Sequence, residues 1–126
     1  MRPVSHIAVL TRDPVLEQAL RFIIEGSLPQ AKLISLTSLE KGHLAVSAEV
    51  LVVDTDNLQE EDLWQLRFLM HARSAPALVL LLGIGFDAAK FADLLGGAKV
   101  VLQKPFENRL FLSALKNILE SDVLTQ

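Results

Sequence analysis

Short apolar runs alternate along the chain with segments in which apolar residues recur at helical spacing. Five runs rich in valine, isoleucine and leucine have the length and composition of buried parallel strands. They are Ile7–Leu10, Leu33–Leu36, Val50–Val53, Ala77–Leu82 and Val100–Leu102. Because strands without polar alternation must be covered on both faces, this pattern predicts an α/β domain with helices on both sides of a parallel sheet.

The segments between these runs predict the helices. The first has apolar residues at i, i+4, i+7 and i+8 from Leu16, after an Asp13-Pro14 pair that suits a helix cap and first turn. Further helices are predicted over Ser38–Ala45, Glu60–Met70, Asp87–Leu95 and Asn108–Leu119. The chain therefore alternates strand and helix five times, which implies parallel strands joined by right-handed crossovers.

Polar residues follow three of the predicted strands. Thr11, Arg12 and Asp13 follow the first strand, Asp54 ends the third, and Lys104 follows the fifth. In parallel α/β sheets, ligands and chemistry gather at the carboxyl ends of the strands. We therefore expect these side chains to converge on one crevice.

The composition excludes several classes of function. The chain has no cysteine, so thiol catalysis, disulfides and thiolate metal sites are excluded. A net charge of −3 leaves no basic field for direct binding of nucleic acid. No apolar segment approaches the roughly 20 residues of a transmembrane helix, and the start of the chain does not resemble a signal peptide. We expect a cytoplasmic protein that does not associate with membranes.

With these motifs the chain resembles the receiver domain of two-component response regulators. The resemblance rests on "VLVVDTD", which ends a strand in Asp54, on "GGAKVVLQKPF" around Lys104, and on "VLTRDPVLEQAL" after the first strand. It covers essentially the whole chain and implies a flavodoxin-like (βα)5 sandwich of three layers, with a parallel sheet in the order 2-1-3-4-5. We treat residues 1–126 as one receiver-like domain, either a free protein or the N-terminal regulatory part of a longer response regulator.

The resemblance also implies a chemistry. In receiver domains an aspartate takes a phosphoryl group from a histidine kinase, with magnesium held by two acids that follow the first strand. A hydroxyl after the fourth strand and a lysine after the fifth bind phosphate oxygens. By this likeness Asp54 is the phospho-acceptor position, Lys104 is the phosphate-binding lysine, and Pro105 follows it, commonly after a cis bond.

Other positions depart from the family pattern. The acid pair should fall on Thr11 and Arg12, and neither offers a carboxylate. The switch hydroxyl should fall near Leu82, yet no serine or threonine occurs between Ser74 and Ser113. A pocket without its acids loses the charge that attracts magnesium.

The remaining charged groups suggest a different arrangement. Asp13 and Asp54 are the acids left for a metal, but Asp13 is well placed to cap a helix. We therefore predict no metal and no cofactor, with magnesium bound only if the domain is phosphorylated. Our hypothesis is that Arg12 and Lys104 together clamp Asp54 in one arrangement.

The last two helices carry more apolar residues than one buried face requires. Between Leu110 and Leu119 the apolar positions cover an arc of roughly 200°, against about 100° for one buried stripe. Receiver domains commonly pair through the face made by the fourth helix, fifth strand and fifth helix. We predict a homodimer through this face; the alternative is deeper burial within the chain. The predicted contact residues are Phe91, Leu94, Leu95, Leu112 and Leu119.

We interpret the chain as an atypical receiver domain and not as an enzyme. It is expected to act in signal transduction as a phosphorylation-independent regulatory and dimerisation module for an output domain or partner. One alternative is a working phospho-receiver that accepts a phosphoryl group on Asp54 from a histidine kinase. A second is a small-molecule sensor with a flavodoxin-like fold that uses the same crevice.

Overall fold

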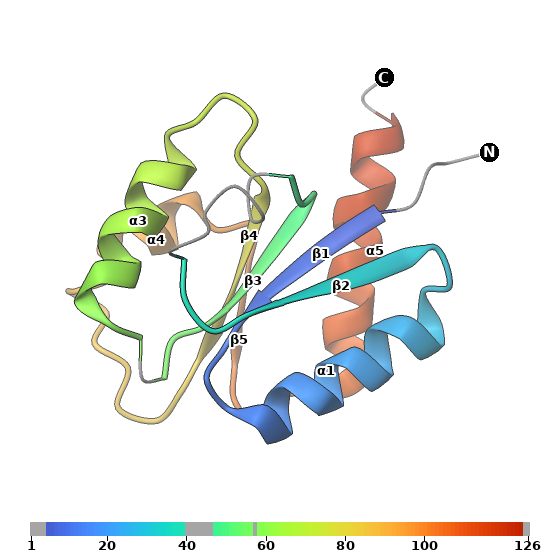
Figure 1. Ribbon diagram of the computed structural model, residues 1–126, viewed down its shortest axis with the longest axis horizontal. Coiled ribbons are helices and arrows are strands. Elements are labelled where there is room, and N and C mark those ends of the chain that lie inside the picture. Colours follow the sequence, from blue (N-terminus) through green and yellow to red (C-terminus); the bar gives the residue numbers. More distant parts are fainter. Residues whose placement is uncertain (1–4, 40–46, 57, 125–126) are drawn as a thin grey trace.

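The computed structural model of the chain contains a five-stranded parallel sheet (Figure 1). The structure describes residues 5–39, 47–56 and 58–124. All five predicted strands are present, and the predicted order is confirmed as β2-β1-β3-β4-β5. The strands are β1 (Ser5–Leu10), β2 (Ala31–Leu36), β3 (Val50–Asp54), β4 (Ala77–Leu82) and β5 (Val100–Gln103).

Helices cover both faces of the sheet, as expected for buried parallel strands. Helices α1 (Pro14–Ser27) and α5 (Asn108–Leu124) lie on one face, and α3 (Glu60–Met70) and α4 (Ala92–Gly97) lie on the other (Figure 1). Most of the predicted helix over Ser38–Ala45 lies outside the described residues. None of the helices in the described part of the chain is long and apolar enough to cross a membrane.

Two helix starts follow directly from local sequence. Pro14 occupies the first turn of α1, and the Asp13 carboxylate accepts the backbone N–H groups of Val15 (3.0 Å) and Leu16 (3.4 Å). Helix α3 begins with three acids, and the Asp62 carboxylate accepts the backbone N–H of Gln59 at 3.2 Å. Both caps satisfy N–H groups that a helix leaves without partners.

The predicted helix Asp87–Leu95 starts later than the sequence pattern indicates, at Ala92. The Asp87 carboxylate accepts the backbone N–H groups of Ala89 and Lys90, at 3.1 and 3.4 Å. This is the same pattern as the Asp13 cap, but residues 88–91 form turns, and Phe91, with φ −109° and ψ 14°, lies outside the helical conformation, so α4 begins only at Ala92. In contrast, α5 is longer than predicted and continues to Leu124.

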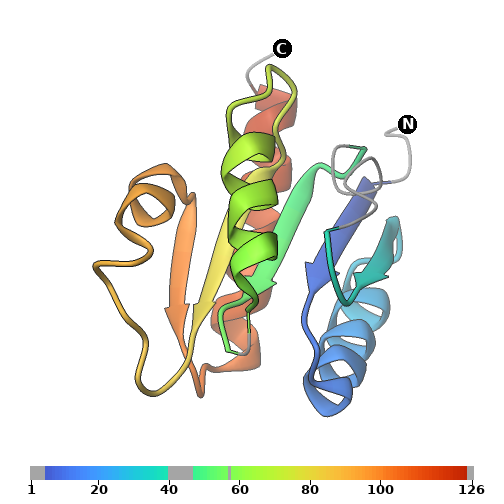
Figure 2. The same ribbon diagram turned by 60° about the vertical axis from the view of Figure 1, so that its left-hand side comes forward.

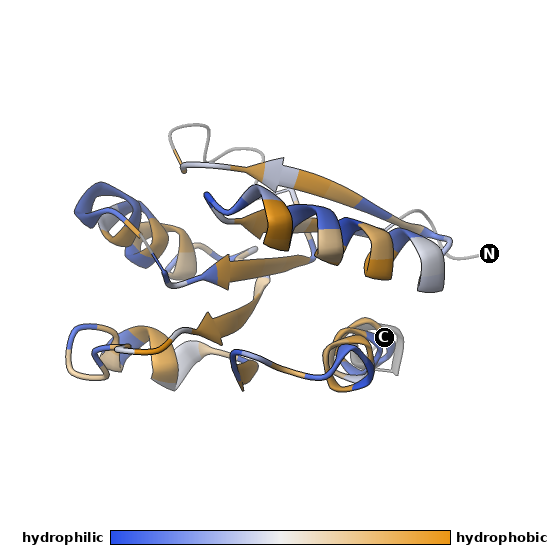
Figure 3. Cartoon of the chain, turned by 90° about the horizontal axis from the view of Figure 1, so that it is seen from below, coloured by the Kyte–Doolittle hydropathy of each residue, from blue (hydrophilic) through white to orange (hydrophobic). Residues whose placement is uncertain are grey.

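The core consists of two layers, one on each side of the sheet. Successive residues of β3 alternate between them: Val50 and Val52 pack toward α1 and α5, and Leu51 and Val53 pack toward α3 and α4. Figure 3 shows the strands as mostly hydrophobic, with a few polar positions. Burial of both sheet faces accounts for much of the chain's 51% content of hydrophobic residues.

The residues predicted as a dimer interface lie mostly in this core. Phe91 and Leu94 are 6% and 3% exposed in the layer under α3, and Leu119 is 7% exposed in the layer under α5. Leu95 and Leu112 are half-buried. The assignment of Phe91, Leu94 and Leu119 to a surface is therefore wrong, because these three side chains pack against the chain's own sheet, whereas Leu110 on the same arc of α5 remains 52% exposed.

Candidate functional site

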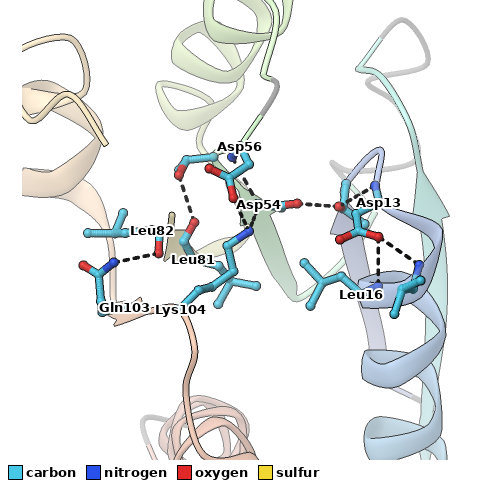
Figure 4. Close-up of polar contacts among 11 residues, drawn as sticks. Asp13, Leu16, Asp54, Asp56, Leu81, Leu82, Gln103 and Lys104 are labelled. Atoms are coloured by element: carbon cyan, nitrogen blue, oxygen red, sulfur yellow. Dashed lines mark hydrogen bonds and ion pairs between the residues drawn. The ribbon is translucent and has the colours of Figure 1, made fainter. Parts of the chain in front are cut away.

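Asp54 lies at the carboxyl end of β3 and is 2% exposed. Its Oδ2 accepts the Thr11 hydroxyl at 2.6 Å, and its Oδ1 accepts the Lys104 ammonium at 2.6 Å. The backbone N–H of Asp56 donates to Oδ1 as well, at 3.2 Å. Both oxygens of this buried carboxylate are therefore held by donors from three different loops (Figure 4).

Lys104 bridges two carboxylates at this end of the sheet. Its Nζ lies 2.6 Å from Asp54 Oδ1 and 2.6 Å from Asp56 Oδ2. Burial by itself lowers the pKa of Lys104, but the hydrogen bonds and charges of the two aspartates outweigh burial and raise the pKa above its usual value. The ammonium is therefore charged at neutral pH. The Lys104-Pro105 peptide bond is cis, as the resemblance implied.

Asp56 is a member of the site that the sequence reasoning missed. Its carboxylate lies against Gly83, where it fills the space that a Cβ at position 83 would occupy. The missing side chain at Gly83 thus lets the Asp56 carboxylate settle beside Lys104. A signal was present in the sequence, because Asp56 follows the strand end at Asp54 by only two residues and so falls at the same edge of the sheet.

Arg12 does not take the role predicted for it. Its Nη2 donates to Asp62 Oδ2 at 2.7 Å, across from the first loop to the start of α3. Asp62 is only 3% exposed and accepts the backbone N–H of Leu39 at 3.2 Å through its other oxygen. The hypothesis that Arg12 clamps Asp54 is therefore wrong, and the hydroxyl of Thr11 stands beside Asp54 in its place.

Two other predicted pocket residues, Asp13 and Leu82, lie near the site but make no hydrogen bond to Asp54. Asp13 is exposed and caps α1, as described above. The carbonyl of Leu82 accepts the backbone N–H of Lys104 at 2.8 Å, while its side chain packs on the α3 side of the sheet. The Thr55 hydroxyl donates to the Leu81 carbonyl at 3.0 Å, so it is engaged with the backbone of β4.

A groove of about 470 Å³ opens beside Lys104. One wall is the apolar side of α1, and the opposite wall is the loop from β5 to α5 together with Ile84. Asp56 and Lys104 form its polar end. The main lining residues are Leu16, Ala19, Leu20, Ile23, Pro105 and Phe106.

The residues around Asp54 do not fit the magnesium site that the resemblance implies. Magnesium requires several oxygen ligands in near-octahedral geometry. At the two acid positions Thr11 donates its hydroxyl hydrogen to Asp54, and Arg12 is a cation paired with Asp62. Across residues 5–39, 47–56 and 58–124, no group of three or more histidine, cysteine, aspartate or glutamate residues could hold a metal ion.

Comparison with known proteins identifies the fold. No protein-family model matches the chain, and no curated protein matches its sequence significantly. A response regulator receiver domain protein from Clostridium thermocellum superposes with a TM-score of 0.76 at 20% identity, covering 97% of this chain and 99% of that one. The chain has the receiver-domain fold.

Two further structures with this fold extend the comparison. A response regulator receiver domain protein from Methanospirillum hungatei gives a TM-score of 0.76 at 16% identity, with 98% of this chain and 99% of that one covered. A putative pilus assembly-related protein from Burkholderia pseudomallei gives 0.72 at 17% identity, with 91% and 89% covered. The resemblance to receiver domains inferred from the sequence is therefore confirmed at the level of the fold.

Proposed function

We propose that this chain is an atypical receiver domain that regulates an output domain or partner protein in the cytoplasm by binding, without phosphoryl transfer and without enzymatic activity. The receiver fold supports a place in two-component signalling. The observation that carries the proposal is the state of Asp54. Both of its oxygens are engaged by short hydrogen bonds, to Thr11 and to Lys104, in a position that is 2% exposed.

The charge balance also disfavours phosphoryl transfer. An aspartate that attacks a phosphoryl group is an anion approaching an anion, so cations must neutralise the charge that develops between them. Here the Lys104 ammonium is shared between Asp54 and Asp56, which leaves this group of three residues net negative. The other nearby cation, Arg12, is paired with Asp62.

A domain without a chemical switch passes on a signal through the surfaces it presents. The fold is shared by response regulators and by a putative pilus assembly-related protein. Such a module could therefore serve either in a signalling protein or in a pilus assembly system. In either setting the fixed hydrogen bonds around Asp54 would keep the carboxyl ends of the strands in one conformation. The partner would then control the output by binding or release.

The direct test is phosphorylation by acetyl phosphate in the presence of magnesium, measured as intact mass. We expect no added phosphoryl group on the wild-type chain, because Asp54 is engaged and the acid pair is missing. A receiver domain that carries the acid pair, treated in parallel, shows that the reagent is active.

The matched variant is Asp54→Asn, which keeps the size of the side chain and removes the nucleophile. Labelling of the wild-type chain that disappears in Asp54→Asn would contradict the proposal and establish a working phospho-receiver. Equal labelling of both chains would locate the reaction elsewhere and leave Asp54 unreactive, as the proposal expects.

A further inference from the structure

Helix α3 carries two aromatic side chains on its outer side. Trp64 is 72% exposed and Phe68 is 84% exposed, whereas Leu63, Leu66 and Leu69 fill the inner side. Residues four apart on a helix are neighbours, so Trp64 and Phe68 form one apolar patch. Figure 2 shows α3 in front of the sheet with no other element over its outer side.

The charges along α3 are arranged asymmetrically around this patch. Glu61 stands in the first turn, and His71 and Arg73 stand beyond the last. Glu60 and Arg67 are already paired within the chain, with Lys90 at 2.7 Å and with Asp93 at 2.9 Å. The acidic end of the helix thus precedes the aromatic pair, and the basic end follows it. A surface with an apolar centre, one acidic end and one basic end is complementary to its own copy turned end to end.

We propose that the α3 face, defined as Glu61, Trp64, Phe68 and His71 together with the adjacent Arg73, is a surface for pairing with a second copy of this chain. A twofold axis beside Leu66, midway between the two aromatic residues, makes the two helices antiparallel. Trp64 of each copy then meets Phe68 of the other. Glu61 of each copy comes near the basic end of the other, and the two helix dipoles oppose each other favourably.

The other exposed aromatic helix position lacks this complementarity. Phe22 on α1 is 83% exposed, nearly as much as Phe68. However, Arg21 of α1 is paired with Glu17 at 2.8 Å and with Glu25 at 3.3 Å, whereas Glu61 and Arg73 of the α3 face have no ion pair with another described residue. Phe22 therefore provides a matched control.

The size of the α3 face indicates a weak dimer. One aromatic side chain buries about 150–250 Å² in contact, whereas a stable interface buries roughly 800 Å² on each partner. The contact area that a single helix of this length can bury reaches only the lower end of the range known for protein interfaces. We expect a dissociation constant on the order of 10–100 μM.

The experiment uses Trp64 itself, because it is the only tryptophan in the chain. Its emission maximum and the sedimentation coefficient of the protein are measured from about 1 μM to about 1 mM. We expect a blue shift and a dimer that appear over the same concentration range. Phe68→Ala should weaken association by about tenfold or more, and Phe22→Ala should leave it unchanged.

Charge reversal tests the antiparallel arrangement. Glu61→Arg should weaken the dimer by placing a further cation against the basic end of the other copy, and the double variant Glu61→Arg with His71→Glu should recover it, because position 61 of each copy faces position 71 of the other. A chain that stays monomeric at about 1 mM, or that loses its dimer equally with Phe22→Ala, would overturn the proposal. Failure of the double variant to recover association would also overturn it, because the charges would not face each other.

Discussion

The aspartates at positions 54 and 56 share one lysine, and this sharing depends on a glycine. The Asp56 carboxylate occupies the space of an absent Cβ at Gly83, and from there it lies 2.6 Å from the Lys104 ammonium. Asp56 is 46% exposed at its side chain, so this ion pair is partly screened by water. Its role is to hold Lys104 in place beside Asp54.

A methyl group at position 83 should therefore disturb Asp56 first, because the three atoms nearest to it all belong to the Asp56 carboxyl group. In an Asp56→Ala background, Gly83→Ala should stabilise the fold by about 0.4–1 kcal/mol through lower entropy of the unfolded chain. With Asp56 present this gain should shrink by about 0.5–1 kcal/mol, because the methyl group displaces the carboxylate from Lys104. Urea unfolding of the four chains measures the difference. Equal effects of Gly83→Ala in both backgrounds would show that the two residues do not interact.

The sequence supported some of these residue contacts and not others. The pairing of Asp54 with Lys104 could be predicted from the sequence, because both lie at the carboxyl ends of strands and the motif around each is distinctive. The partner of Arg12 could not be predicted from the sequence, since a long side chain in a loop can reach several acids. Its choice of Asp62 depends on where α3 begins and on how closely that helix end approaches the first loop.

At the scale of elements, Asp62 joins three segments of the chain. It accepts hydrogen bonds from the Arg12 side chain and from the backbone N–H groups of Gln59 and Leu39. The start of α3 is thereby tied to the loop after β1 and to the residues after β2. Asp13, in contrast, caps α1 from an exposed position and contacts only its own neighbourhood.

The two caps should therefore differ in their contribution to stability. Asp62→Ala should lower the free energy of unfolding by about 2–4 kcal/mol, because it leaves the buried backbone N–H of Leu39 without its acceptor and removes one partner of Arg12. Asp13→Ala should cost about 1 kcal/mol, as an exposed cap does. Urea denaturation of both variants measures this comparison. A loss for Asp62→Ala no larger than that for Asp13→Ala would mean that Asp62 does not join the three segments.

Periodicity located most elements, with one exception. The strands and α1 followed from apolar spacing and from the Asp13-Pro14 start. The helix predicted from Asp87 begins only at Ala92, although the Asp87 carboxylate accepts the N–H groups of Ala89 and Lys90 as a cap would. Apolar spacing and a capping residue did not reveal that the backbone at Phe91 leaves the helical conformation.

At the scale of the whole molecule, the alternating pattern along the chain predicted the parallel sheet, and the resemblance to receiver domains implied its order. The distribution of apolar surface was harder to predict. The broad apolar arc of α5 indicated an interface, but Phe111, Leu115 and Ile118 on this helix pack into the layer between α5 and the sheet. Exposed aromatic residues appear on α3 instead, because its inner side is already filled by leucines.

We propose that the chain's own side chains hold the Asp54 site in one state that takes up neither magnesium nor a phosphoryl group. Thr11, Lys104 and Asp56 all contribute to this arrangement. A receiver with its acid pair would instead bind magnesium and a phosphoryl analogue together, and the amides around the acceptor would change their environment.

The most direct test is a titration with beryllofluoride and magnesium, followed by amide NMR at Thr55, Asp56 and Gly83. We expect no saturable shift of these amides up to about 10 mM magnesium, because the site lacks the acids that attract this ion. Saturable shifts at these three amides that vanish in Asp54→Asn would contradict the account.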